Sequence, residues 1–398
     1  MLLLLVLLAN LLKILNDMHI VFVGLPGVPY RRRACDIRLT YFANLLASSN
    51  TIKIVNWYSP TSLNKDNRGE LDDSIQIIDI VKSRDTHGWK TKLLYLLSII
   101  MEPYVLLKLN KRQHIDVIHV YTERVFVYIT YFLIARLIGA KLVYSYVEDR
   151  STFEYSSKFK RHLQNFADWI AAKCSDGVIP ISDYLKRKAL RLNSKLKCIK
   201  IPPICDFEQF RKMPLHNKID DKYLLYCGST SYIEVAEFIA KSFYESKISK
   251  SRKLVLVLSG NDKRRNEIKM KYPDTIVLSN LSYLDLISSF TFAEALFIPL
   301  RNMDSEIARF PNKVCEYIAS HGVIISTNYG EIANYFKHQE NALLCNNYKI
   351  KEMTTLLDNL ADGMFNLNEI KENAYRTGLQ HFDLYSYKES INEFLSFL

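Results

Sequence analysis

A lysine and a glutamate three residues apart, Lys313 and Glu316, stand in the part of the chain whose residue types and spacing best suit chemistry. They begin a run with helical spacing, and Gly322 follows that run as glycine does after helix ends. The apolar residues 323–325 then predict a short, buried parallel strand. An ammonium group and a carboxylate are therefore expected at a helix start on the ligand-binding edge of a parallel sheet. A surface helix with a solvated glutamate is the alternative.

A glycine-containing turn, residues 24–27, follows the first predicted strand. It lacks the three spaced glycines of a dinucleotide fingerprint, and Asn56 stands where that fingerprint has an acidic residue. These departures disfavour a nicotinamide enzyme. Glycine in such a turn still lets a ligand approach the backbone closely.

A second turn, Gly228-Ser229-Thr230-Ser231, leads into the first helix of the second half of the chain. Its backbone N–H groups and hydroxyls are suited to hold a pyrophosphate. An ordinary strand-to-helix turn with a Ser or Thr cap is the alternative. Gly260, after the next predicted strand, has the same two interpretations.

Apolar runs and amphipathic stretches alternate along the chain, which predicts strands and helices in turn. In the first half, strands are expected at 19–23, 52–57, 75–81, 116–120, 141–146, 177–180 and 198–201. In the second half, they are expected at 223–227, 254–258, 276–278, 295–299, 323–325 and 342–345. This alternation predicts an α/β protein with two Rossmann-like, doubly wound parallel sheets and a boundary near residues 202–216.

The chain has 398 residues, a net charge of +11 and 48% hydrophobic residues. This length predicts two or three domains, and the charge favours an anionic partner: nucleic acid, a phosphorylated substrate or an acidic membrane. No helix-turn-helix, ribonucleoprotein or zinc-finger spacing appears, so nucleic acid is disfavoured. The seven scattered cysteines form no Cys-x-x-Cys pair, which predicts a reducing compartment, no disulfide framework and no zinc site.

Three stretches have features of membrane contact. Residues 1–12 are apolar but too short to span a bilayer; we expect translation to start at Met18, with a short surface anchor as the alternative. Residues 89–111 predict either a buried helix pair broken before Pro103 or a membrane-surface face. The basic segment 186–200 is either a solvated helix face or a docking site for anionic phospholipid.

Several of these segments resemble the group 1 family of retaining glycosyltransferases, which has the GT-B fold. In that family a proline-containing loop, Lys, Glu-Tyr and Gly precede an apolar strand, as they do in FPNKVCEYIASHGVIISTNYGEIANYF and the following ENALL. Supporting matches are VIPISDYLKRKAL, KIPPICDFEQF, Asp36-Ile37-Arg38-Leu39 and the terminal HFDLYSYKESINEFLSFL. Together the matches extend from Met18 to Leu398.

The resemblance implies two Rossmann-like domains that face a cleft, at 18–205 and 206–383, with a C-terminal helix at about 384–398 that packs back on the first. It implies transfer of a sugar, with retention, from a nucleoside-diphosphate sugar to a saccharide or lipid-linked acceptor. Basic residues and helix N-termini, rather than a metal ion or cofactor, would stabilise the departing diphosphate. We therefore expect a hexosyltransferase of bacterial surface polysaccharide or lipopolysaccharide synthesis, located in the cytoplasm with the inner-membrane surface as a candidate partner.

The resemblance also assigns roles to single residues. Glu316 matches the glutamate that holds the donor ribose and Lys313 would offset phosphate charge, so these two are the catalytic candidates. The donor-binding candidates are Gly228, Ser229, Gly260, Asn280, Leu281, Arg309, Asn312, Lys313 and Glu316. The acceptor-side candidates are Gly27, Arg31, Arg38 and Glu148. The arginines suit an acceptor phosphate, whereas an internal ion pair of a surface loop is the alternative for Glu148.

Two positions depart from the family pattern. The family's first glutamate lies eight residues before the second, where this chain has Ala308, with Glu306 nearby. The Arg and Lys that usually follow the first strand of the second domain are absent. The candidates to replace them are Lys263, Arg264 and Arg265, or Arg309 and Lys313. These departures leave open a non-catalytic GT-B subunit that binds a partner transferase or a lipid, and a sugar-nucleotide epimerase.

Overall fold

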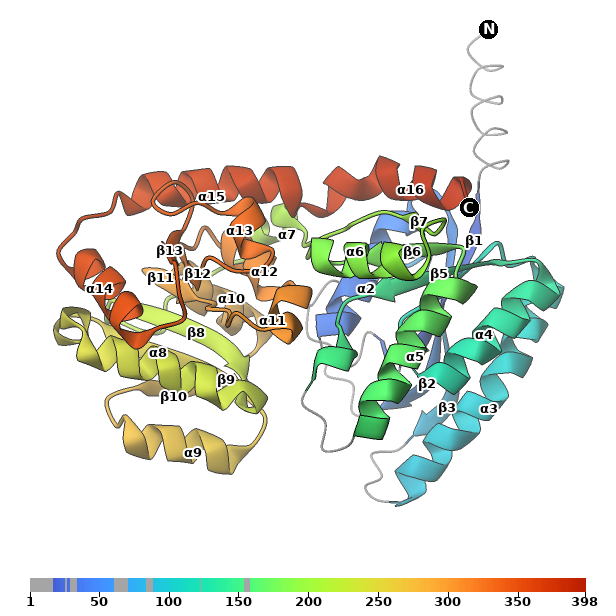
Figure 1. Ribbon diagram of the computed structural model, residues 1–398, viewed down its shortest axis with the longest axis horizontal. Coiled ribbons are helices and arrows are strands. Elements are labelled where there is room, and N and C mark those ends of the chain that lie inside the picture. Colours follow the sequence, from blue (N-terminus) through green and yellow to red (C-terminus); the bar gives the residue numbers. More distant parts are fainter. Residues whose placement is uncertain are drawn as a thin grey trace, which may run out of the picture. The chain divides into compact units, whose positions relative to one another are not determined.

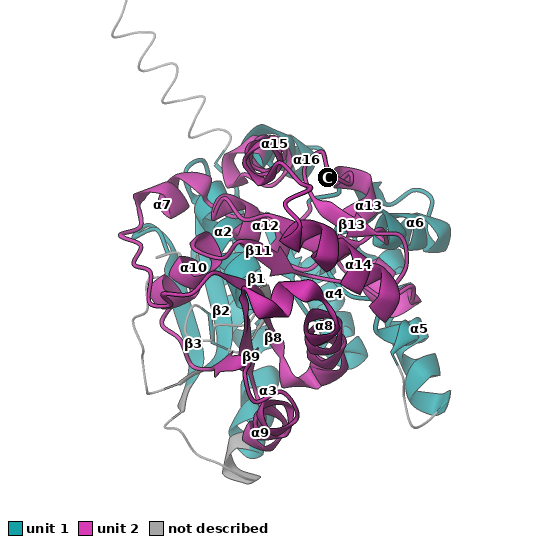
Figure 2. Ribbon diagram, turned by 90° about the vertical axis from the view of Figure 1, so that its left-hand side faces the viewer, with its two compact units in different colours: residues 1–201, 387–398 teal, residues 202–386 magenta. Residues whose placement is uncertain are grey.

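The computed structural model describes residues 17–25, 27–28, 34–60, 71–83, 89–122, 124–153 and 158–398. The chain forms two compact units: unit 1 comprises Met1–Ile201 with Tyr387–Leu398, and unit 2 comprises Pro202–Ser386 (Figure 2). Of the residues singled out in the sequence, 1–12 and Arg31 lie outside the described ranges.

Unit 1 is built on a seven-stranded sheet in the order β3-β2-β1-β4-β5-β6-β7, in which every pair of neighbours is parallel (Figure 1). Its strands are β1 (His19–Leu25), β2 (Thr51–Pro60), β3 (Gln76–Ser83), β4 (Val117–Val120), β5 (Lys141–Tyr146), β6 (Gly177–Pro180) and β7 (Lys197–Cys198). Its helices are α2 (Ala34–Ala47), α3 (Trp89–Arg112), α4 (Val125–Ile138), α5 (Lys158–Cys174), α6 (Asp183–Leu192) and α16 (Lys388–Ser396). The central strands are buried on both faces, which explains why they are continuous apolar runs rather than alternating ones.

One prediction for unit 1 is wrong, because residues 89–111 form a single helix, α3, with Pro103 inside it. A proline removes one helical hydrogen bond and usually breaks or kinks a helix. Here the turns on both sides of it are held by tertiary packing, since Ser98, Glu102 and Leu106 recur at helical spacing on the buried side.

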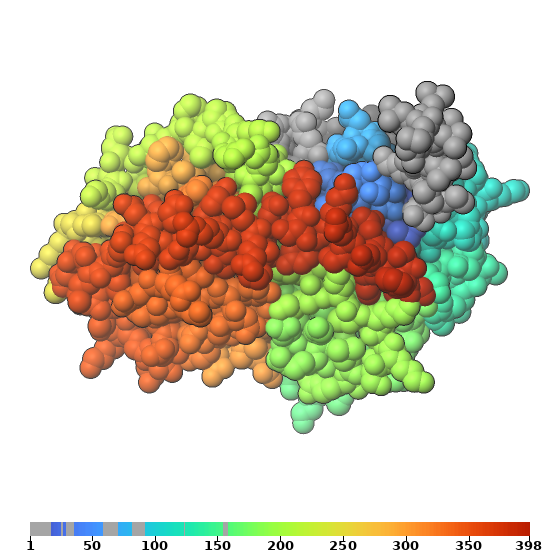
Figure 3. Space-filling model, turned by 90° about the horizontal axis from the view of Figure 1, so that it is seen from above, coloured from blue at the N-terminus to red at the C-terminus, as the bar shows by residue number. Residues whose placement is uncertain are grey.

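The C-terminal helix α16 packs against α2 in unit 1. Asn50 donates to Asn392 over 2.9 Å, and a side chain at Gly177 would meet the ring of Phe394 at 2.7 Å. Figure 3 shows the last residues, in the darkest red, on the surface against the blue segment that contains α2.

Unit 2 carries a six-stranded sheet in the order β10-β9-β8-β11-β12-β13, again with parallel neighbours. Its strands are β8 (Tyr223–Ser229), β9 (Lys253–Ser259), β10 (Ile276–Leu278), β11 (Ala295–Phe297), β12 (Ile324–Thr327) and β13 (Leu343–Cys345). Its α-helices are α7 (Phe207–Lys212), α8 (Ile233–Glu245), α9 (Asp262–Lys271), α10 (Tyr283–Thr291), α11 (Asp304–Ala308), α12 (Lys313–Ala319), α13 (Ile332–Tyr335), α14 (Ile350–Ala361) and α15 (Leu367–His381). The predicted α/β class with two parallel sheets is confirmed, whereas α7, α9 and α11 were not predicted from the sequence.

Candidate functional site

The two catalytic candidates lie together on α12, whose start follows the carboxyl end of β11 in unit 2. Lys313 Nζ forms an ion pair with Glu316 Oε2 and lies 5.6 Å from the centre of the Phe290 ring. The Glu316 side chain is buried, and its Oε1 has no hydrogen-bond partner in the described part of the chain. The Tyr317 hydroxyl fixes the helix against β8, because it accepts a hydrogen bond of 3.1 Å from the Cys227 N–H. The solvated-glutamate alternative is therefore wrong, and one buried carboxylate oxygen of Glu316 is left without a hydrogen-bond partner within the described ranges.

Two arginines and a glutamate form a second cluster in the segment between β11 and α12, which contains α11. The buried Glu306 carboxylate accepts hydrogen bonds from Arg301, at 2.6 Å from the backbone N–H and at 2.7 Å from Nε. Arg309 Nη2 lies 3.6 Å from the same carboxylate, and the guanidinium lies 4.4 Å from the centre of the Tyr232 ring. Arg309 Nε is buried without a hydrogen-bond partner among the described residues. Arg301 was missed in the sequence, where it has no motif around it.

The turns after β8 and β9 are tied to one another. Ser229 Oγ accepts a hydrogen bond of 3.1 Å from the Ser231 N–H, which is the cap expected of an ordinary turn. Thr230 Oγ1 accepts one of 2.8 Å from the Asn261 N–H. Gly260 has a φ of +110°, and a Cβ there would lie 2.4 Å from Thr230 Oγ1. Glycine at this position therefore serves both the backbone conformation and the close contact between the turns.

The two candidate replacements for the missing phosphate clamp lie in different surroundings. Arg264 Nη1 donates to the Thr230 carbonyl at 2.8 Å, and Arg265 Nη1 donates to the Gly260 carbonyl at 2.9 Å. Both guanidinium groups thus stabilise the two turns through hydrogen bonds to backbone carbonyls. Arg309 instead stacks on Tyr232, at the start of the helix that follows β8.

Four further positions of unit 2 are described by backbone conformation or burial: the donor-side candidates Asn280 and Leu281, and the nearby Gly330 and Ala308. Asn280, with Leu281 after it, follows β10 and has a φ of 54°, a left-handed conformation that asparagine tolerates better than most residues. Gly330 has a φ of +58°, and a Cβ there would lie 3.2 Å from Ile307 Cα. Ala308, where the family has a glutamate, is completely buried.

The acceptor-side candidates that the structure describes, Gly27, Arg38 and Glu148, belong to three different segments of unit 1. Gly27 lies in the turn after β1 with a φ of 75°. Arg38 is buried on α2, where Nη2 donates to the Ile201 carbonyl at 2.6 Å and the guanidinium lies 4.8 Å from the centre of the Phe42 ring. Glu148 is partly exposed and lies 3.8 Å from Arg150, the ion pair expected in the alternative interpretation.

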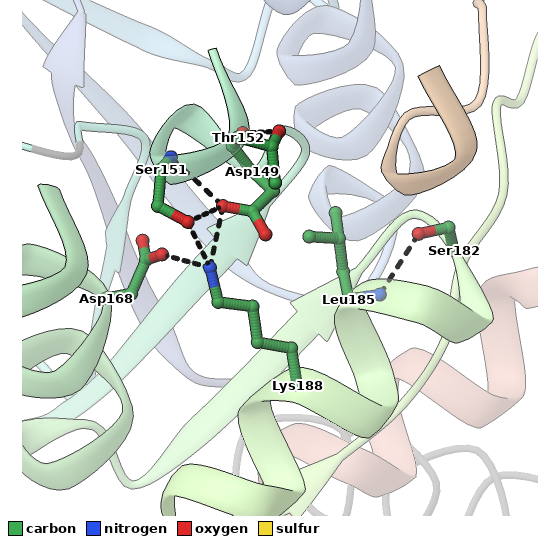
Figure 4. Close-up of polar contacts among 7 residues, drawn as sticks. All are labelled: Asp149, Ser151, Thr152, Asp168, Ser182, Leu185 and Lys188. Carbon is green, nitrogen blue, oxygen red and sulfur yellow. Dashed lines mark hydrogen bonds and ion pairs between the residues drawn. The ribbon is translucent and has the colours of Figure 1, made fainter. Parts of the chain in front are cut away.

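A buried ion-pair cluster that includes Asp149, the residue after Glu148, was not predicted from the sequence (Figure 4). Lys188 Nζ, on α6, lies 2.6 Å from Asp149 Oδ1 and 2.6 Å from Asp168 Oδ2. Both carboxylates are buried, and burial raises the pKa of Asp168 in spite of the lysine. Lys188 was predicted to belong to a solvated or lipid-binding face, but it is an internal counter-ion. Lys200 of the same segment also pairs within unit 1, at 2.8 Å from Asp183.

A second buried carboxyl, Glu102 on α3, was also missed because its partners come from other elements. Its Oε2 accepts hydrogen bonds of 2.6 Å from Trp57 Nε1 on β2 and 2.6 Å from the Tyr131 hydroxyl on α4. Burial raises the pKa of this carboxyl to about 7, although these two donors and the Gly24 N–H act in the opposite direction.

The turn after β1 is held by Asn56 rather than by an acidic residue. Its side chain accepts from the Val28 N–H at 3.0 Å and donates to the Val28 carbonyl at 2.8 Å. It also donates to Asp79 Oδ1 at 2.9 Å. Asn56 therefore has a structural role in shaping this turn.

Within the described ranges, no group of three or more His, Cys, Asp or Glu side chains is placed to hold a metal ion. No disulfide bond joins the six cysteines whose side chains the structure describes.

Comparisons with known proteins agree with this architecture. Residues 221–362 match the family model of glycosyl transferases group 1. Among solved structures, a sucrose-phosphate synthase from Thermosynechococcus elongatus is 13% identical with a TM-score of 0.76, over 95% of this chain and 98% of that one. A glycosyltransferase from Rickettsia africae is 16% identical with a TM-score of 0.70, over 96% and 98% of the two chains. HepE from Anabaena, in complex with UDP-glucose, is 13% identical with a TM-score of 0.68, over 96% and 100%.

A search of curated proteins finds no match. The two parallel-sheet units define the class, which is the GT-B fold. Within that class, the match over residues 221–362 confirms the resemblance to the group 1 glycosyltransferases.

Proposed function

We propose that this protein is a retaining glycosyltransferase that binds a nucleoside-diphosphate sugar on unit 2 and transfers the sugar to a saccharide or lipid-linked acceptor. The observation that carries the proposal is the buried Glu316, which is paired with Lys313 through one oxygen and has its other oxygen unpartnered among the described residues. HepE, whose fold this chain shares, was solved with UDP-glucose, which supports a nucleotide-sugar donor. The proposal places the reaction in the cytoplasm, within the synthesis of a bacterial surface polysaccharide or lipopolysaccharide.

In this proposal the free oxygen of Glu316 accepts hydrogen bonds from the donor ribose, and Lys313 and Arg309 offset the diphosphate charge. The acceptor hydroxyl attacks the anomeric carbon on the face from which the diphosphate departs. The bond from the anomeric carbon to the diphosphate oxygen breaks, the new glycosidic bond forms on the same face, and the acceptor proton passes to the diphosphate. Cationic side chains near the departing oxygens favour the transition state because negative charge develops there. In this proposal the charge on the departing diphosphate is stabilised by side chains rather than by a metal ion.

A non-catalytic GT-B subunit is the second candidate, and one observation favours it. The family's first glutamate is replaced by the buried Ala308, and the nearby Glu306 is neutralised by Arg301. A carboxylate held in this way is less available to a substrate than a free one. A subunit of this kind would bind a partner transferase or a lipid without turning over a donor.

Donor binding and turnover separate the two candidates. Thermal-shift and calorimetric titrations with UDP-, GDP- and CMP-linked sugars are compared for the wild type, Glu316→Gln and the exposed control Glu267→Gln. We expect one nucleotide class to stabilise the wild type and the control, and roughly tenfold or weaker binding by Glu316→Gln, since a charged hydrogen bond is worth about 1.5–3 kcal/mol.

Release of the nucleoside diphosphate with an acceptor extract then tests catalysis. Binding without any release would favour the non-catalytic subunit. Equal binding by Glu316→Gln and by the wild type would contradict the assignment of this site.

A further inference from the structure

The outward side of three neighbouring helices in unit 1 is unusually apolar. Helices α3, α4 and α5 lie side by side (Figure 1), and α4 contacts both of the others. Of the 21 large hydrophobic side chains that are exposed within the described ranges, 14 belong to these helices. They are Leu93, Leu96, Leu97, Ile100, Met101, Tyr104, Leu107, Phe126, Leu133, Leu137, Phe159, Leu163, Phe166 and Trp169, and we call this set the three-helix face. Concentrated apolar surface of this kind marks an interaction site rather than ordinary scatter.

The apolar stripe of α3 follows helical periodicity along most of the helix. Its exposed positions 93, 96, 97, 100, 104 and 107 recur every three or four residues. Its opposite side is tied to the sheet by Glu102, which is bound by Trp57 and Tyr131. Residues Lys92–Arg112 are long and apolar enough to cross a membrane by length and composition. Because their buried side is part of the unit 1 fold, α3 presents its exposed side from the surface of that fold.

The charges on these helices are all of one sign where they are exposed. Their only two carboxylates are Glu102 and Asp168, and both are buried and hydrogen-bonded within unit 1. The exposed lysines and arginines of α3 and α5 are Lys92, Lys108, Lys111, Arg112, Lys158, Lys160, Arg161 and Lys173. The exposed charged side chains on the helices that carry the three-helix face are therefore all positive.

We propose that the three-helix face docks unit 1 on the surface of an anionic phospholipid membrane. The aliphatic and aromatic side chains would enter the boundary between head groups and acyl chains, as amphipathic surface helices do. The lysines and arginines would meet the lipid phosphates, with their apolar stems along the membrane surface. A second copy of the chain fits less well, because its own three-helix face would oppose positive charge with positive charge.

This docking surface is distinct from the basic segment 186–200. Two lysines of that segment are already paired within unit 1. Lys188 pairs with Asp149 and Asp168, and Lys200 pairs with Asp183. Membrane docking also does not depend on the proposed donor site, which lies in unit 2.

The test is vesicle flotation of the full chain with phosphatidylcholine alone and with equal parts of phosphatidylcholine and phosphatidylglycerol. The apolar variant carries Leu96→Ser, Ile100→Ser and Tyr104→Ser, and the charge variant carries Lys158→Gln, Lys160→Gln and Arg161→Gln. The matched controls in unit 2 carry Met270→Ser, Met364→Ser and Leu379→Ser, or Lys222→Gln, Lys250→Gln and Lys269→Gln, all at exposed positions.

We expect the wild type and both controls to float with the anionic vesicles and to be released by high salt. The charge variant should partition on the order of 100-fold less into them, because each basic residue near an anionic surface contributes substantially. The apolar variant should lose binding to a similar extent while its melting temperature and its donor-induced thermal shift stay at the wild-type values.

Three results would overturn the proposal. They are a wild type that floats with neither vesicle, variants that bind as the wild type does, and light scattering that shows a dimer dispersed by the apolar variant without any vesicle binding. Loss of donor response with flotation intact would instead count against the proposed function alone, and flotation of that kind would support the docking surface.

Discussion

Replacing the buried Glu102 by glutamine should change how the stability of unit 1 depends on pH. Burial raises the pKa of this carboxyl from 4.5 to about 7, so the folded protein holds the proton more tightly than the unfolded chain does. The contribution of this protonated carboxyl to the unfolding free energy is therefore fully present below pH 4.5 and is lost as the pH rises through about 7. A pKa change of this size corresponds to about 3 kcal/mol of unfolding free energy. Glutamine does not ionise, so the unfolding free energy of Glu102→Gln lacks this pH-dependent contribution.

Urea unfolding at a series of pH values from about 5 to about 8 measures the effect. Tryptophan fluorescence reports on unit 1 alone, because the three tryptophans, at 57, 89 and 169, all belong to that unit. We expect the unfolding free energy of Glu102→Gln, relative to the wild type, to rise by about 3 kcal/mol across this range. Any constant cost of the amide cancels in this comparison.

The exposed Glu267→Gln control should show no such rise. A relative stability of Glu102→Gln that stays flat with pH would refute the reasoning. It would mean that the carboxyl ionises in the folded protein much as it does in water, despite its burial.

Three further substitutions test other contacts. Lys188→Met leaves two buried aspartates without their counter-ion. It should lower the unfolding free energy by about 3–5 kcal/mol at neutral pH in urea titrations, and by less in acid. The control Arg187→Met, at an exposed position, should change the unfolding free energy little. Gly260→Ala places a Cβ 2.4 Å from a threonine hydroxyl at a φ of +110°. It should therefore cost about 1–3 kcal/mol more than Gly363→Ala, where φ is +73° and nothing lies within 4 Å. Equal melting temperatures of the two variants would contradict this. Tyr317→Phe removes the acceptor of a β8 backbone N–H and should cost about 1–3 kcal/mol in thermal unfolding, with weaker donor binding as α12 loosens.

The site of unit 2 was predictable to the extent that it depends on local patterns. The spacing around Lys313 and Glu316 placed both on one helix before a buried strand, and the structure has them there as an ion pair. The Arg301–Glu306 pair was not predictable, because nothing in the sequence distinguishes those two residues from surface charges. The pair forms because the segment after β11 brings the Arg301 guanidinium and backbone N–H onto the buried Glu306 carboxylate of α11.

Helix α3 shows a second limit of sequence reasoning. Its composition was compatible with a buried helix pair and with a membrane-surface face. The structure gives one helix with a buried side and an exposed apolar side, because packing on β2 and α4 outweighs the break expected at Pro103. Propensity is a local quantity, and tertiary contacts of a few kcal/mol override it.

The sequence alone therefore determined the alternation of strands and helices, the two parallel sheets and the turns at their carboxyl edges, since periodicity and glycine placement are set by the local backbone. Which charges are partnered follows from how distant elements pack together, which the sequence patterns do not show. Lys188 lies between two aspartates, Glu102 accepts hydrogen bonds from β2 and α4, and the Arg38 guanidinium donates to the Ile201 carbonyl. Each of these contacts joins elements that are distant in the chain, and their strength comes from burial that no single segment encodes.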